Sequence, residues 1–187
     1  MMPDKFRNKY RIPSSRLPDW DYRWAGAYFV TLCTKDRRHD FGEIVDGQME
    51  LSGIGMVADV LWHEIKHHAP QVELDAFVVM PNHVHGILVL PGIGAVDDDA
   101  QPESPSTPAP SPKNETMAGI SPKPGSLSTI IRSYKSAVTK HAHRLGFEFE
   151  WQTRFYEHII RDETAWHTIR QYIANNPTNW KEDKFYE

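Results

Sequence analysis

Apolar and polar residues follow two different periods along this chain. Short runs rich in β-branched and aromatic residues predict strands at residues 27–34, 72–80, 83–90, 147–152 and 155–161. Residues 41–45 and 48–51 flank an Asp46-Gly47 pair, which is a strong signal for a two-residue hairpin turn. The chain therefore carries a small hairpin in addition to the strands of a larger sheet.

Helical spacing of apolar residues separates these strands. It runs over residues 52–68 and again from Leu127 to Leu145, which predicts two helices. Asp162 is in position to cap a last helix over residues 163–175, which Pro177 ends. This order predicts an α+β fold of the ferredoxin-like, split βαβ type, with an antiparallel sheet, helices packed mainly on one face and an extra C-terminal helix.

One segment departs from both periods. Residues 91–124 hold eight of the 14 prolines, together with many Ser, Thr, Gly and Asp. Such a segment buries too little apolar surface to offset its ordering entropy, so we predict a flexible insertion. We expect one domain over residues 26–180, preceded by a basic and aromatic arm at 1–25 and followed by a tail at 181–187.

Composition narrows the class of protein. The 187 residues include a single cysteine, Cys33, and neither a long apolar run nor the apolar core of a signal peptide. These features indicate a protein of the reducing cytoplasm, with no membrane partner. The net charge of -4 argues at first against nucleic acid. However, residues 91–124 carry five acids and two bases, whereas the first 38 residues carry nine bases and four acids, so locally basic surface remains available.

Candidate chemistry begins at the start of the strand at 83–90. His83 and His85 are two residues apart, so on a strand they project from one face and can bind a single divalent ion, while Val84 points the other way. A second His-x-His pair, at residues 141–143, lies in a helical stretch, where residues two apart diverge. Only the strand pair has chelating geometry.

Several ways of completing that site fail on the sequence. The residues after His85 offer no glutamate of the cupin type, no second His-x-Ser/Thr motif is present, and His63-Glu64 lacks the second histidine of HExxH. Tyr172 and Asn176 share one face of the last helix and could supply a phenol and an amide oxygen. Spacing alone favours a simpler interpretation, a half-buried aromatic residue and a helix-terminal asparagine.

Four segments together resemble the REP-associated tyrosine transposases, which belong to the His-hydrophobic-His single-strand DNA nucleases. They read GAYFVT at 26–31, FGEI at 41–44, ELDAFVVMPNHVHGI at 73–87 and WQTRFYEHIIR at 151–161. The similarity extends from Arg11 to Trp180 outside the proline-rich segment, and YIANN at 172–176 matches the family's Tyr-x-x-x-Asn.

The resemblance implies a site and a reaction. Metal ligands would be His83, His85 and Asn176, the nucleophile Tyr172, and the cofactor Mg²⁺ or Mn²⁺. The substrate would be hairpin-forming, palindromic single-stranded DNA, cut through a 5′-phosphotyrosine intermediate. Tyr134 and Tyr156 are rival nucleophiles, but Tyr134 lies on an apolar helical stripe and is better explained as core.

Basic residues would hold the DNA phosphates, and the candidates are Arg11, Arg16, Arg37, Arg38, Arg132, Lys135, Lys140 and Arg154. The expected partner is single-stranded or hairpin DNA, bound by a monomer or a homodimer near the nucleoid. Two alternatives stay open. One is a domesticated relative that binds hairpin DNA without cutting it, and the other is a metal hydrolase that uses His83 and His85 with water and needs no tyrosine.

Overall fold

The computed structural model describes residues 25–91 and 125–186. The predictions for the N-terminal arm, with Arg11 and Arg16, and for nearly all of the proline-rich segment lie outside these residues. Among the described residues, no helix is long and apolar enough to cross a membrane. The elements are β1 (Gly26–Cys33), η2 (Lys35–Arg37), β2 (Gly42–Val45), β3 (Gln48–Leu51), α1 (Gly53–His63), α2 (Ile65–His68), β4 (Glu73–Met80), β5 (His83–Leu90), α4 (Leu127–Arg144), β6 (Tyr156–Ile160), α5 (Glu163–Asn175) and η3 (Trp180–Glu182).

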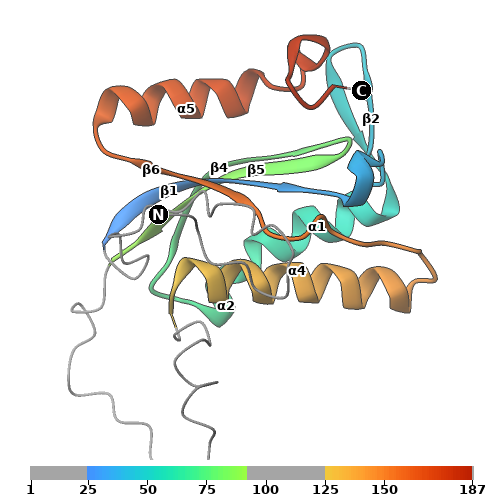
Figure 1. The fold of residues 1–187 in the computed structure, drawn as a ribbon, viewed down its shortest axis with the longest axis horizontal. Helices are drawn as coiled ribbons and strands as arrows, with labels where there is room; N and C mark the ends of the chain where they lie inside the picture. The colour runs from blue at the N-terminus through green and yellow to red at the C-terminus, as the bar shows by residue number, and fades with distance from the viewer. Residues whose placement is uncertain (1–24, 92–124, 187) are drawn as a thin grey trace, which may run out of the picture.

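A four-stranded antiparallel sheet forms the centre of the domain. Its strand order is β4-β5-β1-β6, and β2 and β3 pair separately as a hairpin. Figure 1 shows α1 and α4 beneath this sheet and α5 across its other face. This is the predicted ferredoxin-like, split βαβ arrangement, with two helices on one face and the additional C-terminal helix on the opposite face.

Each face of the sheet has its own apolar core, because strand side chains alternate between faces. Val84 and Leu88 of β5 contribute to the core between the sheet and helices α1 and α4, with Trp62 and Tyr134 from those helices. Ile87 belongs to a smaller cluster that packs against Ile173 of α5. His83 and His85 have the same parity as Ile87, so they face α5 rather than the larger core.

Helix boundaries follow the sequence closely, because polar side chains cap the free backbone amides at each start. Ser52 accepts from Gly55 N before α1, Ser126 from Thr129 N before α4, and Asp162 from Ala165 N before α5. The predicted helix over residues 52–68 is divided at Glu64 into α1 and α2.

The strand predicted at residues 147–152 is wrong. This segment bonds to the end of β1 through Lys35 N to Glu150 O and Gln152 N to Cys33 O, both at 2.9 Å, and makes one isolated bridge, Thr34 with Trp151. The reason lies in its partner. After Thr34 the chain turns through left-handed residues at 36 and 37, so β1 has no further extended backbone to pair with.

Gly86 marks a close approach of β5 to α1. A Cβ atom on Gly86 would lie 2.2 Å from Cζ2 of Trp62, whose indole is fully buried and stacks on Phe77 at 4.5 Å between ring centroids. A strand residue with any side chain would therefore displace the indole. The glycine lets β5 pack directly against the helix layer that supports it.

We expect Gly86→Ala to lower the free energy of unfolding by about 1–3 kcal/mol, the usual cost of overpacking a core. Urea denaturation would measure it. Gly26→Ala is the matched control, because a Cβ on Gly26 would make only ordinary contacts with Tyr28 at 3.6 Å. That change should stay within about 0.5 kcal/mol of wild type. Equal effects of the two substitutions would contradict a steric role for Trp62.

Candidate metal centre and tyrosine

The two predicted imidazoles lie side by side at the start of β5. The Nε2 atoms of His83 and His85 are 3.0 Å apart, and both side chains are fully buried. Strand pairing fixes this position, since His83 faces Cys33 and His85 faces Thr31 across the β1–β5 ladder. The pair therefore sits on a strand whose neighbours on both sides hold it in register.

Contacts at the Nδ1 atoms orient both rings. His83 Nδ1 lies 2.8 Å from Asn82 Oδ1, an acceptor, so Nδ1 carries the proton and Nε2 keeps its lone pair. His85 Nδ1 lies 2.9 Å from Thr31 Oγ1. Hydrogen bonds at the outer nitrogen are the usual way in which proteins orient metal-binding histidines. The Nε2 atoms of the two rings therefore face each other.

The two histidines are uncharged near neutral pH. Burial, together with the positive charges of Lys184 and Arg37, lowers the pKa of His83 to about 3. Burial also lowers the pKa of His85 well below its ordinary value, helped by His83, while the carboxylate of Asp183 opposes the shift. Neutral imidazole is the form that binds a metal ion.

Helix α5 brings the predicted tyrosine to this pair. The Tyr172 hydroxyl is 3.2 Å from His85 Nε2 and donates to Asp183 Oδ2 at 2.9 Å. Its ring packs edge-on to Phe29 of β1, with centroids 6.2 Å apart. Burial and the hydrogen bond to Asp183 raise the pKa of the phenol, so Tyr172 is protonated in the resting site. Tyr172 is 40% exposed, so the residue lies at the edge of the site rather than in the core.

Asn176 lies one helical turn further on and is 2% exposed. Its Nδ2 donates to Asp183 Oδ2 at 3.0 Å. Its Oδ1 is buried and has no hydrogen-bond partner within residues 25–91 and 125–186. A buried carbonyl oxygen without a partner normally lowers the stability of the fold by about 1–3 kcal/mol. Such an atom in a native structure often marks a site for a water molecule or an ion.

A divalent cation fits these donors. Two ligands at right angles on an ion with bonds of about 2.1 Å lie about 3 Å apart, as the Nε2 atoms of His83 and His85 do. The unpartnered Asn176 Oδ1 and the carboxylate of Asp183 are oxygen donors of the kind that Mg²⁺ and Mn²⁺ prefer. Ligand atoms of His83, His85 and Asp183 all lie within 4.8 Å of one another.

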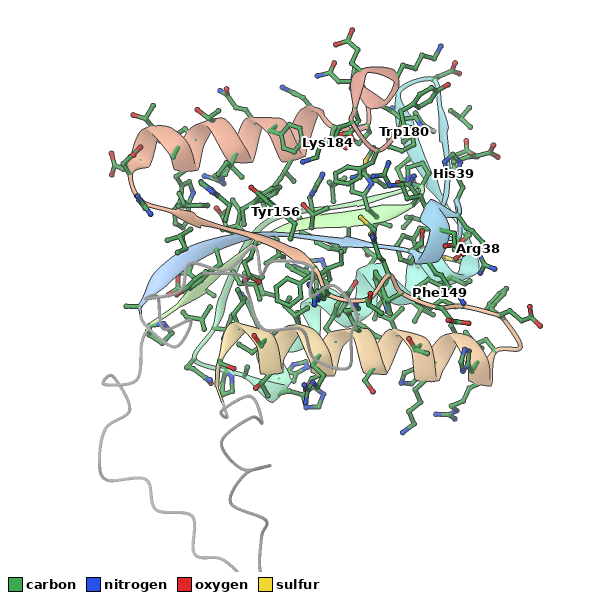
Figure 2. The ribbon with its side chains drawn as sticks, in the orientation of Figure 1. Arg38, His39, Phe149, Tyr156, Trp180 and Lys184 are labelled. Carbon is green, nitrogen blue, oxygen red and sulfur yellow. The ribbon has the colours of Figure 1, made fainter. Side chains whose placement is uncertain are left out.

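Asp183 is the residue that sequence reasoning missed. It belongs to the predicted tail at 181–187, which folds back against β5: Asn82 Nδ2 donates to the Phe185 carbonyl at 2.9 Å, and Asp183 Oδ1 accepts from Phe185 N at 2.7 Å. No spacing or periodicity in the sequence signals this return. Figure 2 shows Lys184 of this tail, and Trp180 just before it, on the same side of the sheet as α5.

The predicted phosphate-binding residues fall on two sides of the molecule. Arg132, Lys140 and Arg154 line an open groove beside α4, on the face opposite the histidines. Lys135 lies in the same groove, but its ammonium donates to the carbonyls of Gln152 and Arg154 at 2.8 and 3.0 Å, and burial lowers its pKa to about 8.

The two arginines after β1 also separate. The Arg37 guanidinium lies 5.3 Å from the centre of the Phe185 ring, on the histidine side. The Arg38 guanidinium instead binds Asp40 at 3.1 Å and the Glu148 carbonyl at 3.0 Å.

The two rival tyrosines, Tyr134 and Tyr156, lie in different places relative to the histidines. Tyr134 is 3% exposed in the core beneath the sheet, and its hydroxyl donates to the Ala58 carbonyl at 2.9 Å, which confirms its role in packing. Tyr156 starts β6 on the α5 side, where its ring lies 6.4 Å from Phe29. It is 46% exposed and remains a neighbour of the site rather than a member of the hydrogen-bonded group.

Comparison with known proteins places these observations in context. No family model matches the chain. An uncharacterized Haemophilus influenzae protein is 36% identical over 174 residues, which are 92% of each chain. The solved structure of a REP-associated tyrosine transposase bound to a REP hairpin has a TM-score of 0.58 at 24% identity, covering 92% of this chain and 77% of that one. A Deinococcus radiodurans structure at 19% identity has a TM-score of 0.37, which is too low to show a common fold.

Identity of 36% over nearly the whole length of both chains shows common membership of one family. The structural match shows a common fold. The chain therefore belongs to the family of this Haemophilus influenzae protein, and its fold is that of the REP-associated tyrosine transposase.

Proposed function

We propose that this protein is a metal-dependent single-stranded DNA endonuclease and strand transferase that acts through Tyr172. The observation that carries the proposal is the 3.2 Å distance between the Tyr172 hydroxyl and His85 Nε2, beside a second imidazole and an unpartnered amide oxygen. A hydrolase that used the histidines with water alone would not need a phenol at this place.

The metal ligands in this proposal are His83, His85 and Asn176, with the Asp183 carboxylate beside them. The chemistry that a divalent ion supplies here, when bound, is polarisation of the phosphate and stabilisation of charge on its oxygens, an effect worth several kcal/mol. The chain's own contribution is to keep both imidazoles neutral and to hold the donor atoms in place before the substrate arrives.

Tyr172 would attack the phosphorus of a backbone phosphate. Ionising a phenol of ordinary pKa at pH 7 costs about 4 kcal/mol, and burial makes that cost larger here. The proton must therefore leave as the bond forms. Asp183 Oδ2 already accepts the hydrogen bond of Tyr172 and is the atom placed to take it, much as an aspartate in protein kinases accepts the proton of the attacking hydroxyl.

Attack by Tyr172 forms an O–P bond and breaks the bond from phosphorus to the 3′ oxygen. The products are a 5′-phosphotyrosine and a free 3′-OH that takes a proton from solvent. Energy of the broken phosphodiester is retained in the covalent intermediate, so another 3′-OH can reverse the step and join strands. The same two atoms, Tyr172 Oη and Asp183 Oδ2, then exchange the proton in the opposite direction.

Hairpin DNA is the substrate class that we propose. The solved structure with the common fold is bound to a REP hairpin. The open groove with Arg132, Lys140 and Arg154 gives this chain a basic surface of its own, despite its acidic net charge. Binding through such groups should weaken steeply with salt, because each neutralised phosphate releases counterions.

Tyr172→Phe should abolish the covalent adduct. Labelled hairpin DNA with single-stranded flanks, incubated with protein and Mn²⁺, should give a denaturant-resistant protein–DNA band in wild type and none in the variant, because the attacking oxygen is gone. Tyr156→Phe is the matched control and should keep the band. An adduct that survives Tyr172→Phe but disappears in Tyr156→Phe would move the nucleophile to β6. Binding without an adduct under any metal would identify a non-cutting hairpin-binding protein.

Asn176→Ala should weaken Mn²⁺ binding at least about tenfold, since even the loss of an outer-shell partner commonly costs 10–100-fold. Isothermal calorimetry on protein without DNA would measure it. Asn175→Ala provides the comparison: it removes the same side chain from the adjacent residue, which is exposed. If both variants bind Mn²⁺ as wild type does, Asn176 is not a ligand.

A further inference from the structure

Two cations flank the histidine pair and share one aromatic ring. The Arg37 guanidinium lies 5.3 Å from the centre of the Phe185 ring, and the Lys184 ammonium lies 4.8 Å from it. That ring packs on His83, with centroids 4.6 Å apart, and lies 5.9 Å from His85. The two positive charges are thus held at the site from different ends of the chain.

Both cations are close enough to His83 to lower its pKa. Burial is the main cause of the lowered pKa of His83, and Lys184 and Arg37 are the charges that add to it. With both imidazoles neutral, Arg37, Lys184 and the Asp183 carboxylate together carry one net positive charge, to which a bound divalent ion would add. A phosphodiester carries one negative charge.

Arg37 is held in place by an unusual backbone. Asp36 and Arg37 are consecutive non-glycine residues with φ of 53° and 52°, in the left-handed region that L-residues rarely adopt. Residues strained in this way cluster at functional sites. The turn is fastened by Arg37 N to Thr34 O and Lys35 N to Glu150 O. It directs Arg37 toward Phe185, whereas Arg38 is engaged by Asp40.

Lys184 is held in place by the contacts of the next residue, Phe185. The backbone of Phe185 is bound to both Asn82 and Asp183, so the residue before it cannot swing freely. The Lys184 ammonium also lies 5.3 Å from the Tyr156 ring on β6. Figure 2 shows Lys184 on the face of the sheet covered by α5, while Arg38 lies at the edge of the molecule.

We propose that Arg37 and Lys184 form a clamp for the non-bridging oxygens of the phosphate that Tyr172 attacks. The proposal rests on the function proposed above and names the groups that position its substrate. The clamp makes and breaks no covalent bond: it fixes the phosphate beside the phenol and offsets charge on its oxygens. Arg132, Lys140 and Arg154 cannot do this, because the sheet separates their groove from the histidines.

A neutral phosphate analogue tests the clamp separately from cleavage. Cutting of hairpin DNA by wild type first maps the scissile position. Fluorescence anisotropy then gives the Kd of Tyr172→Phe, which cannot cut, for the same oligonucleotide with a native phosphate or an uncharged methylphosphonate at that position. The methylphosphonate should weaken binding about tenfold, the size of one charge-assisted hydrogen bond.

In the Tyr172→Phe background, adding Arg37→Gln or Lys184→Gln should reduce this penalty to about threefold, because one partner of the charge is missing. Arg37→Lys should restore part of it. Arg38→Gln and Lys181→Gln are matched controls from the same loop and the same C-terminal segment, and both should keep the tenfold penalty. Melting temperatures would confirm that all variants fold.

Two results would overturn the clamp. One is a penalty that stays tenfold without Arg37 and without Lys184, and the other is an equal loss in the Arg38 and Lys181 variants. Either result, obtained with wild-type protein that still forms the tyrosine adduct, removes the clamp and leaves the proposed function intact. A wild-type protein that forms no adduct removes both, since no phosphate is then attacked.

Discussion

The approach of His83 Nε2 to His85 Nε2, 3.0 Å apart in a fully buried position, is the constraint on which this site depends. Two imidazolium ions could not share that space, so burial keeps both rings uncharged. The outer nitrogens of the two rings are bound to Asn82 and Thr31, and these contacts hold the rings in this orientation. The geometry of the strand therefore favours the neutral form of both rings, which is the form in which imidazole can bind a metal ion.

The two faces of the sheet differ in what they pack against. Its lower face packs against α1 and α4 in the larger core, where even a tyrosine, Tyr134, uses its hydroxyl for a helix carbonyl. Its upper face has a smaller apolar cluster around Ile173, and His85 and Tyr172 meet beside that cluster. Because β5 serves both faces, a tightly packed lower layer holds the histidines still without occupying the space above them.

Much of this arrangement could be predicted from the sequence. Period-two alternation placed His83 and His85 on one face, and the capping residues Ser52 and Asp162 fixed where helices begin. Tyr172 and Asn176 were harder, because helical spacing puts them on one side of α5 but does not say what that side meets. Family resemblance supplied that link, and the distances now support it.

What could not be predicted depends on where the chain returns. Asp183 and Lys184 reach the site only because the segment after Pro177 folds back onto Asn82, a contact between residues a hundred positions apart. The failed strand at 147–152 has the same origin, since its partner leaves the sheet at Asp36 and Arg37. Charge patterns had a similar limit: they identified a basic side of α4 but not that the sheet lies between it and the histidines.

The isolated oxygen of Asn176 has a thermodynamic consequence. Leaving it without a partner makes the folded chain about 1–3 kcal/mol less stable than its packing alone would allow. Any cation that this atom binds relieves that deficit only in the native state, so ion occupancy and resistance to unfolding are linked by mass action. Under the proposed function, the metal site is then also a point where the concentration of divalent ions acts on the stability of the fold.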